Sequence, residues 1–199
     1  MMPVTVDRNQ LLAAQLMLTG VRNGLPKVQA RAVNKALAKS LTASSKEIGA
    51  TVNLKAARIK KDFTQVKANY SDPGGKLICK GDPVGLINYA ARQVKDGVSV
   101  QVLKSKPRTI LKHAYIATYR GTQHVFWRAY DGPRAPFNPK MKYGALPMKY
   151  KKPVERLTGP RIPDIFDRNE VMTIVLDVAA DSYQQNFEHE LERELERLR

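Results

Sequence analysis

Apolar residues in the first third of the chain recur with the period of an α-helix. Asp7 can cap a first helix that ends near Arg22, and Pro26 stands at the first position of a second helix that extends to about Gly49. One face of the second helix carries apolar and small side chains at spacings of three and four: Val33, Leu37, Leu41, Ser44 and Ile48. This face is predicted to pack on a core.

After residue 62 the apolar period falls to two, which indicates β-strands. The segments concerned are residues 63–68, 77–79, 85–94, 98–102, 114–119 and 124–130. Asp96-Gly97 and a turn around Gly121 are predicted to close two hairpins. We interpret Trp127 as a core anchor on the same side of its strand as Val125.

No period is visible between residues 131 and 163, where seven of the twelve prolines lie. Basic residues are interleaved with them: Lys140, Lys142, Lys149, Lys151 and Lys152. A stretch of about 30 residues is too long for an ordinary connection and is typical of a functional arm or a linker. Because proline lowers the entropy lost when a segment is pinned, we predict an extended arm that lies on another subunit, with a flexible loop as the alternative.

Residues 164–199 are predicted to form a long amphipathic helix. Asp167 and Glu170 have the spacing of a capping box, and the 31 residues from Arg168 to Leu198 would span about 46 Å. That exceeds the width of a compact domain of this size, so the helix is expected to pack on the body (residues 1–130) or on a neighbouring subunit. Its apolar stripe supplies the candidate oligomer contacts: Tyr183, Phe187, Leu191 and Leu195.

These elements predict an α+β fold. N-terminal helices and a central, mostly antiparallel sheet form the basic body of residues 1–130. The proline-rich basic arm of residues 131–163 and the helix of residues 164–199 follow it.

Charge is distributed unevenly along the chain. The 199 residues include 34 Lys and Arg against 18 Asp and Glu, a net charge of +16. Residues 1–160 hold 29 basic and 8 acidic residues, whereas residues 161–199 hold 5 and 10. Such a surplus points to a polyanion, an acidic protein surface or an assembly, and disfavours an acidic cytosolic enzyme. The acidic tail either folds back on its own body or docks on the basic body of a neighbour.

Two predicted helices carry rows of basic residues. Like charges four residues apart repel one another on a helix, so an uninterrupted row favours a partner over a solvated face. Asn53 can cap the second of these helices, which extends from Leu54 to about Lys61. Together with the arm lysines, the rows give the candidates for contact with an acidic partner or DNA: Lys27, Arg31, Lys35, Lys39, Lys55, Arg58 and Lys61.

The sequence contains no catalytic or metal-binding motif. Cys79 is the only cysteine, so an intramolecular disulfide and a thiolate metal cage are excluded. Near the C-terminus, glutamates precede arginines by three residues, which is typical of a solvated helix. No apolar run approaches the roughly 18 residues of a membrane span. The histidines are scattered: His113, His124 and His189. We therefore predict a protein that is not an enzyme, with no cofactor, no metal and no membrane partner.

The segment from Tyr115 to Tyr150 holds eight of the fourteen aromatic residues among basic side chains. This mixture is used where bases stack above a positive groove. Because side chains alternate along a strand, at least one face of the hairpin must be core. The segment therefore favours non-specific contact with DNA over a sequence-specific reader.

Four segments resemble the minor tail protein Z family of long, non-contractile tailed bacteriophages and prophages. The first two are the basic helix VQARAVNKALAKSLTASSKEI (28–48) and the short basic helix NLKAARIKKDF (53–63). The others are the hairpin HAYIATYRGTQHVFWR (113–128) and GPRIPDIF (159–166), which leads into the last helix. The similarity covers residues 28–198, and the chain departs from the family in its proline-rich insert and glutamate-rich end.

The resemblance implies a structural virion protein that completes the tail. Such proteins act at the head-proximal end, the neck, and make the tail competent to join a DNA-filled head. The implied partners are copies of the chain in a six-fold ring, the tail terminator, other neck or tail-tube proteins and the end of the packaged DNA. The implied location is the virion, with the host cytoplasm during assembly. Non-specific DNA binding is the alternative function.

Overall fold

The computed structural model describes residues 8–19, 24–128 and 154–197, and it confirms the predicted α+β class. The chain divides into two compact units. The described residues of 1–50, 55–82 and 161–199 form the helical unit, and those of 51–54 and 83–160 form the sheet unit. This division differs from the predicted boundary at residue 130, because the chain leaves the helical unit after β2 and returns to it at residue 161.

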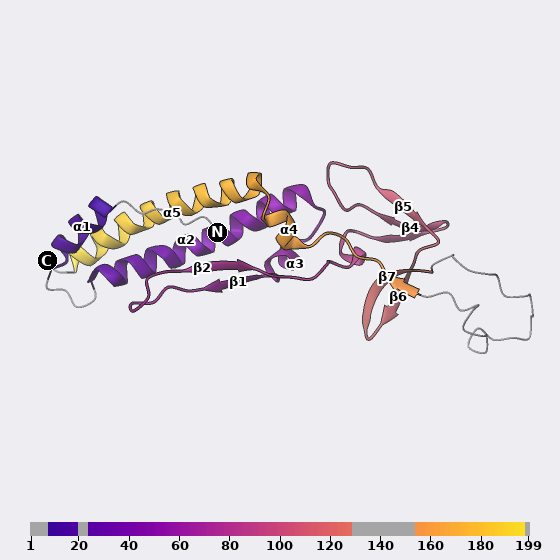
Figure 1. Cartoon of the computed structure of the whole chain (residues 1–199), viewed down its shortest axis with the longest axis horizontal. Coiled ribbons are helices and arrows are strands. Elements are labelled where there is room, and N and C mark those ends of the chain that lie inside the picture. The colour runs from indigo at the N-terminus through magenta and orange to yellow at the C-terminus, as the bar shows by residue number, and fades with distance from the viewer. Residues whose placement is uncertain (1–7, 20–23, 129–153, 198–199) are drawn as a thin grey trace, which may run out of the picture. The chain divides into compact units, whose positions relative to one another are not determined.

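Three helices form the helical unit's main layer. Helices α1 (Arg8–Met17), α2 (Gly24–Thr51) and α5 (Asn169–Glu196) lie side by side in Figure 1. Their shared apolar cluster consists of the buried Ala14, Leu18, Val28, Ala32 and Phe187 and the partly buried Leu11, Leu25, Tyr183, Leu191 and Leu195. The predicted apolar stripe of α5 therefore lies in this core, whereas α2 contributes Val28 and Ala32 to it and not the face predicted from the sequence.

A two-stranded hairpin covers another side of α2 (Figure 1). It consists of β1 (Phe63–Val66) and β2 (Lys76–Cys79), which are antiparallel. The Asn34 amide on α2 donates to the Ala68 carbonyl at 3.0 Å and accepts from the Ala68 N–H at 2.9 Å. At one end of the unit lie α3 (Ala56–Lys60) and α4 (Ile162–Phe166), where Phe166 packs edge-on against Phe63 at 5.2 Å.

The sheet unit holds two three-stranded antiparallel sheets. One is β3 (Arg92–Val94), β4 (Gly97–Val100) and β5 (Thr109–Lys112). The other is β6 (Tyr115–Tyr119), β7 (Thr122–Arg128) and β8 (Val154–Arg156). Both predicted hairpin turns are present. The predicted central sheet, however, is not a single sheet. The described strands form three separate sheets, and each strand pairs only with strands near it in the sequence.

Several predicted element ends differ from the structure. The segment 85–94 is not one strand, since the 3₁₀ turn η1 (Leu86–Asn88) precedes β3 and buries Tyr89. Lys55, and not Asn53, stands at the N-cap position of α3 and makes no side-chain cap hydrogen bond, while the Asn53 backbone N–H donates to the Val102 carbonyl. Helix α5 begins after Arg168 without a side-chain cap, because Asp167 instead closes α4.

The predicted arm of residues 131–163 falls mostly outside the described residues, as does the predicted cap Asp7. Its last part is not an extended arm. Residues 154–156 form β8, which pairs with β7, and α4 begins at Ile162. β8 is an outer strand of this sheet and lies on the side of β7 away from β6.

Candidate assembly and nucleic-acid surfaces

Ion pairs join α2 to α5 within the chain. Lys35 lies 2.7 Å from Glu190, and Arg31 lies 3.4 Å from both Glu190 and Glu194. Lys27 pairs with Glu194 one turn further along. Arg193 and Arg197, each three residues after one of these glutamates, lie 3.9 and 3.5 Å from them. We call the α2 cations together with Glu190 and Glu194 the charge ladder.

The two glutamates of the charge ladder are buried and remain ionised. Glu190 is 1% exposed and Glu194 is 4% exposed. Burial alone would raise the pKa of Glu190, but the hydrogen bond from Lys35 and the charges of Lys35, Arg31 and Arg193 outweigh it, so the pKa lies below the ordinary value. The Lys27 hydrogen bond likewise holds the pKa of Glu194 low against the effect of burial.

Through Glu190 and Glu194 the acidic tail folds back on its own body, which is one of the two predicted arrangements; docking of the tail on a neighbour stays a prediction. Lys27, Arg31 and Lys35, predicted as contacts for a partner or DNA, are paired inside the chain. The interpretation of the glutamate-rich end as a solvated helix is wrong at two positions, because every fourth residue faces the α2 cations. The remaining glutamates are exposed: Glu188, Glu192 and Glu196.

Sequence reasoning missed this pairing, although a signal was present. The three α2 cations and the two glutamates are both spaced by four residues, the repeat that keeps side chains on one helix face. Two such rows of opposite sign match when the helices lie antiparallel. Nothing local in either segment identifies the other as its partner.

The candidate oligomer contacts on α5 lie in the core of the helical unit. Phe187 is buried, and Tyr183 stacks on it with ring centroids 5.7 Å apart. Leu191 and Leu195 are partly buried in the same cluster. These side chains are therefore covered by α1 and α2 of the same chain, and their contact with another subunit stays a prediction.

The remaining basic candidates lie on different parts of the chain. Lys39 is exposed at the edge of a shallow groove beside α5. Around α3, Lys55 and Lys61 are exposed, whereas Arg58 pairs with Asp62 at 2.6 Å. The arm lysines lie outside the described residues: Lys140, Lys142, Lys149, Lys151 and Lys152.

The sheet of β6, β7 and β8 gathers aromatic and basic side chains on one face. Tyr115 is paired with Phe126, Tyr119 with Thr122, and paired residues of antiparallel strands point the same way. The Tyr115 and Phe126 rings lie 6.1 Å apart, and the Arg128 guanidinium lies 5.9 Å from the Tyr115 ring centre. In the adjacent turn Arg120 lies 5.4 Å from the Tyr119 ring. We call Tyr115, Tyr119, Arg120, Phe126 and Arg128 the aromatic-basic face.

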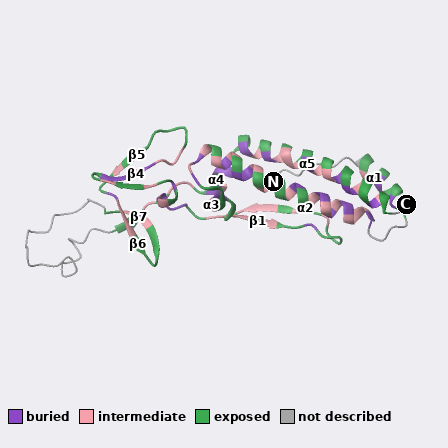
Figure 2. Cartoon of the chain, turned by 180° about the vertical axis from the view of Figure 1, so that it is seen from behind, coloured by how far each residue is buried: buried purple, intermediate pink, exposed green. Residues whose placement is uncertain are grey.

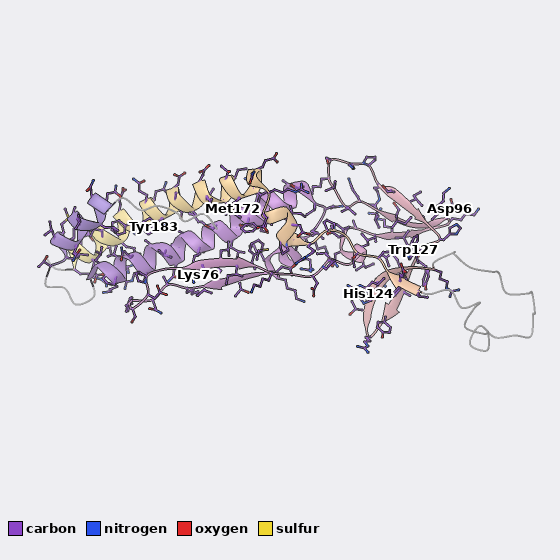
Figure 3. The ribbon with its side chains drawn as sticks, in the orientation of Figure 1. Lys76, Asp96, His124, Trp127, Met172 and Tyr183 are labelled. Atoms are coloured by element: carbon purple, nitrogen blue, oxygen red, sulfur yellow. The ribbon has the colours of Figure 1, made fainter. Side chains whose placement is uncertain are left out.

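The prediction that Trp127 is a core anchor is wrong. Trp127 is 41% exposed, whereas Val125 on the same side of β7 is 1% exposed. The Trp127 Nε1–H donates to the Glu155 carboxylate on β8 at 3.0 Å, which satisfies the polar end of the indole at the surface. His124, which Figure 3 labels together with Trp127, lies on the opposite side of β7. Its ring packs edge-on against that of Phe126, with the ring centroids 5.9 Å apart.

Cys79 is expected to react slowly as a thiol. Burial, with the nearby charges of Asp62 and Asp167, raises its pKa to about 12. The thiolate is the reactive form, so iodoacetamide at pH 8 should alkylate the native chain about a thousandfold more slowly than an unperturbed cysteine. Mass spectrometry over time measures the rate, with the urea-unfolded chain as control. Equal rates for folded and unfolded chain would contradict this placement.

Within residues 8–19, 24–128 and 154–197, no three His, Cys, Asp or Glu side chains are placed to hold a metal ion. None of the described helices is long and apolar enough to cross a membrane. No protein-family model, curated protein or solved structure matches the chain.

Proposed function

We propose that the chain is a structural protein of a phage tail neck, which completes the tail by forming a ring that binds the tail terminator. The proposal rests on the resemblance of the segments in α2, α3, the β6–β7 hairpin and α4 to the minor tail protein Z family. In this role the protein carries out no catalysis and needs no cofactor. Its partners are protein surfaces and, through the aromatic-basic face, the end of the packaged DNA.

One structural observation supports the proposal: each unit exposes large apolar side chains. On α1, Leu12 is 59% exposed and Leu16, one turn later, is 76% exposed. On the sheet unit Ile110 and Val154 are about half exposed, at 51% and 48%. A head-to-tail ring joins two different patches on each subunit, and exposed apolar groups of this kind supply contact area.

The test is assembly with tails. The full chain, mixed with the tail terminator and tail tubes lacking this protein, should give a stoichiometric complex by native mass spectrometry and electron microscopy. Leu12→Ser with Leu16→Ser should weaken that complex about tenfold or more, because two exposed apolar contacts are lost. Val66→Ser, at a 44% exposed site on β1, is the matched control. A chain that ignores both terminator and tails would overturn the proposal.

Non-specific DNA binding is the second candidate, favoured by the aromatic-basic face. Tyr119 is 56% exposed. Arg120 lies over the Tyr119 ring, and Arg128 lies over the Tyr115 ring. Bases can stack on such rings while the guanidinium groups contact phosphates. The absence of a matched reading motif in the sequence favours contact without sequence preference.

Salt dependence distinguishes this candidate. Fluorescence anisotropy with a single-stranded oligonucleotide should show affinity that falls linearly with log salt. Arg120→Ala with Arg128→Ala should make the slope of log affinity against log salt concentration shallower by about 1.4. Each phosphate contact contributes about 0.7 to that slope on single strands. Lys104→Ala with Lys106→Ala, exposed lysines of the same unit, are the control. No binding at low salt would eliminate the candidate.

A further inference from the structure

The outer side of α5 carries a continuous acidic stripe. Helix α5 has a buried and an exposed side in Figure 2. Five exposed acidic residues recur on it at spacings of seven, four, seven and four: Glu170, Asp177, Asp181, Glu188 and Glu192. At 3.6 residues per turn they fall within about 60° of the helix circumference. None of them belongs to the charge ladder, which uses Glu190 and Glu194.

One large apolar side chain interrupts this stripe. Ile174 is 43% exposed and lies four residues after Glu170 and three before Asp177. It therefore projects from the same side of the helix, between two carboxylates about 10.5 Å apart along the axis. An exposed isoleucine flanked by carboxylates is suited to a small apolar groove with basic edges.

The same unit contains a groove of this kind. It is lined by Ala38, Lys39, Thr42, Ala43 and Lys46 on α2 and by Val178 on α5. Both lysines are exposed, and neither makes an ion pair or hydrogen bond to another described residue. The small side chains leave room for a helix to approach α2 closely.

The spacing of the two surfaces matches. Lys39 and Lys46 are seven residues apart, as are Glu170 and Asp177, so each pair spans about 10.5 Å along its helix. Thr42 and Ala43 lie midway between the lysines, as Ile174 lies between the carboxylates. Opposite charges at equal spacing, with an apolar side chain facing small residues between them, form complementary halves of one contact.

We propose that the acidic stripe of α5 from one copy docks in the α2 groove of a second copy. Ile174 packs on Ala38, Thr42 and Ala43, while Glu170 and Asp177 pair with Lys39 and Lys46. A second copy is the occupant because each chain carries both halves at the same spacing. This inference rests on the proposed function and deepens it, since it adds a charged surface to the exposed apolar side chains through which copies of the chain associate.

Charge reversal tests the contact in the full chain, using nuclease-treated protein and sedimentation velocity over a concentration series. Lys39→Glu with Lys46→Glu should weaken self-association at least about tenfold, and so should Glu170→Lys with Asp177→Lys, because two pairs become repulsive in each. Mixing the two variants should restore association, since the reversed groove of one fits the reversed stripe of the other. Lys60→Glu with Lys80→Glu, on exposed lysines away from the groove, is the control.

Three results would overturn the docking: a wild-type chain that stays monomeric, association that survives the groove reversal, or mixed variants that do not recover. Far-ultraviolet circular dichroism shows that each variant is folded, and recovery on mixing cannot arise from unfolded protein. A wild-type monomer that still binds the tail terminator would overturn the docking alone. A chain that self-associates through the groove but ignores terminator and tails would leave the docking intact and overturn the proposed function.

Discussion

Replacing Glu190 with lysine is expected to detach the C-terminal half of α5 from α2. The new ammonium group would be buried beside Lys35 and Arg31 and would leave both without their shared carboxylate. Because the α2 cations are partly solvated, we expect a loss of about 3 kcal/mol, at the lower end of the cost of breaking a buried pair. For a chain of this size that lowers the melting temperature by roughly 6–12 °C in a thermal unfolding experiment.

The matched control is Glu192→Lys, which makes the same charge change on the same helix at an exposed position. It should leave the free energy of unfolding within about 0.5 kcal/mol of wild type. If both variants melt at the same temperature, the charge ladder does not hold α5 in place. Hydrogen exchange should also localise the effect of Glu190→Lys to α5 and the adjoining turns of α2.

The ladder also makes stability depend on pH. The pKa values of Glu190 and Glu194 are lowered by folding from an ordinary value of 4.5, so the unfolded chain takes up protons first as the pH falls. Their contribution is complete above about pH 5 and is lost as the pH falls through the lowered folded values. The difference in stability between wild type and Glu190→Gln should therefore be constant near neutrality and shrink below about pH 4 in urea titrations.

Local periodicity predicted the elements of this chain better than their partners. The helical repeat of α2, the Asp96-Gly97 turn and the β6–β7 hairpin are encoded by neighbouring residues, and all are present in the structure. Helix caps were less predictable, since Asn53 and Asp167 serve other contacts. Trp127 was misplaced because the alternation that assigns it to one side of β7 does not show that the core ends after Val125.

The candidate surfaces, too, were predictable only where they depend on neighbouring residues. Sequence identified the basic row on α2 and the acidic helix, but their pairing depends on contacts between residues about 160 positions apart in the chain, such as Arg31 and Glu190. The core role of Tyr183 and Phe187 depends on α1 and α2 in the same way. The aromatic-basic face needed only the local hairpin, so its composition was visible in the sequence.

Gly97→Ala is expected to disrupt the sheet of β3, β4 and β5. Gly97 has a φ of 151°, which side-chain-bearing residues rarely adopt, and it pairs with Lys112 on β5. A Cβ atom there would overlap the Leu111 carbonyl oxygen and lie 3.1 Å from the Lys112 Cα. Because both neighbours are backbone, the clash can be relieved only by separating β4 from β5.

Separation would expose Val98 and Val100, which are 0% and 4% exposed in the native sheet. Strain and lost packing together should cost about 3–5 kcal/mol, measurable by urea unfolding and by hydrogen exchange in β3–β5. Gly121→Ala is the control, since Gly121 also has a positive φ, of 77°, but nothing lies within 4 Å of its added Cβ. It should cost only about 1 kcal/mol of backbone strain. If the two variants lose equal free energy of unfolding, the φ angle, and not the close approach of β5, constrains Gly97.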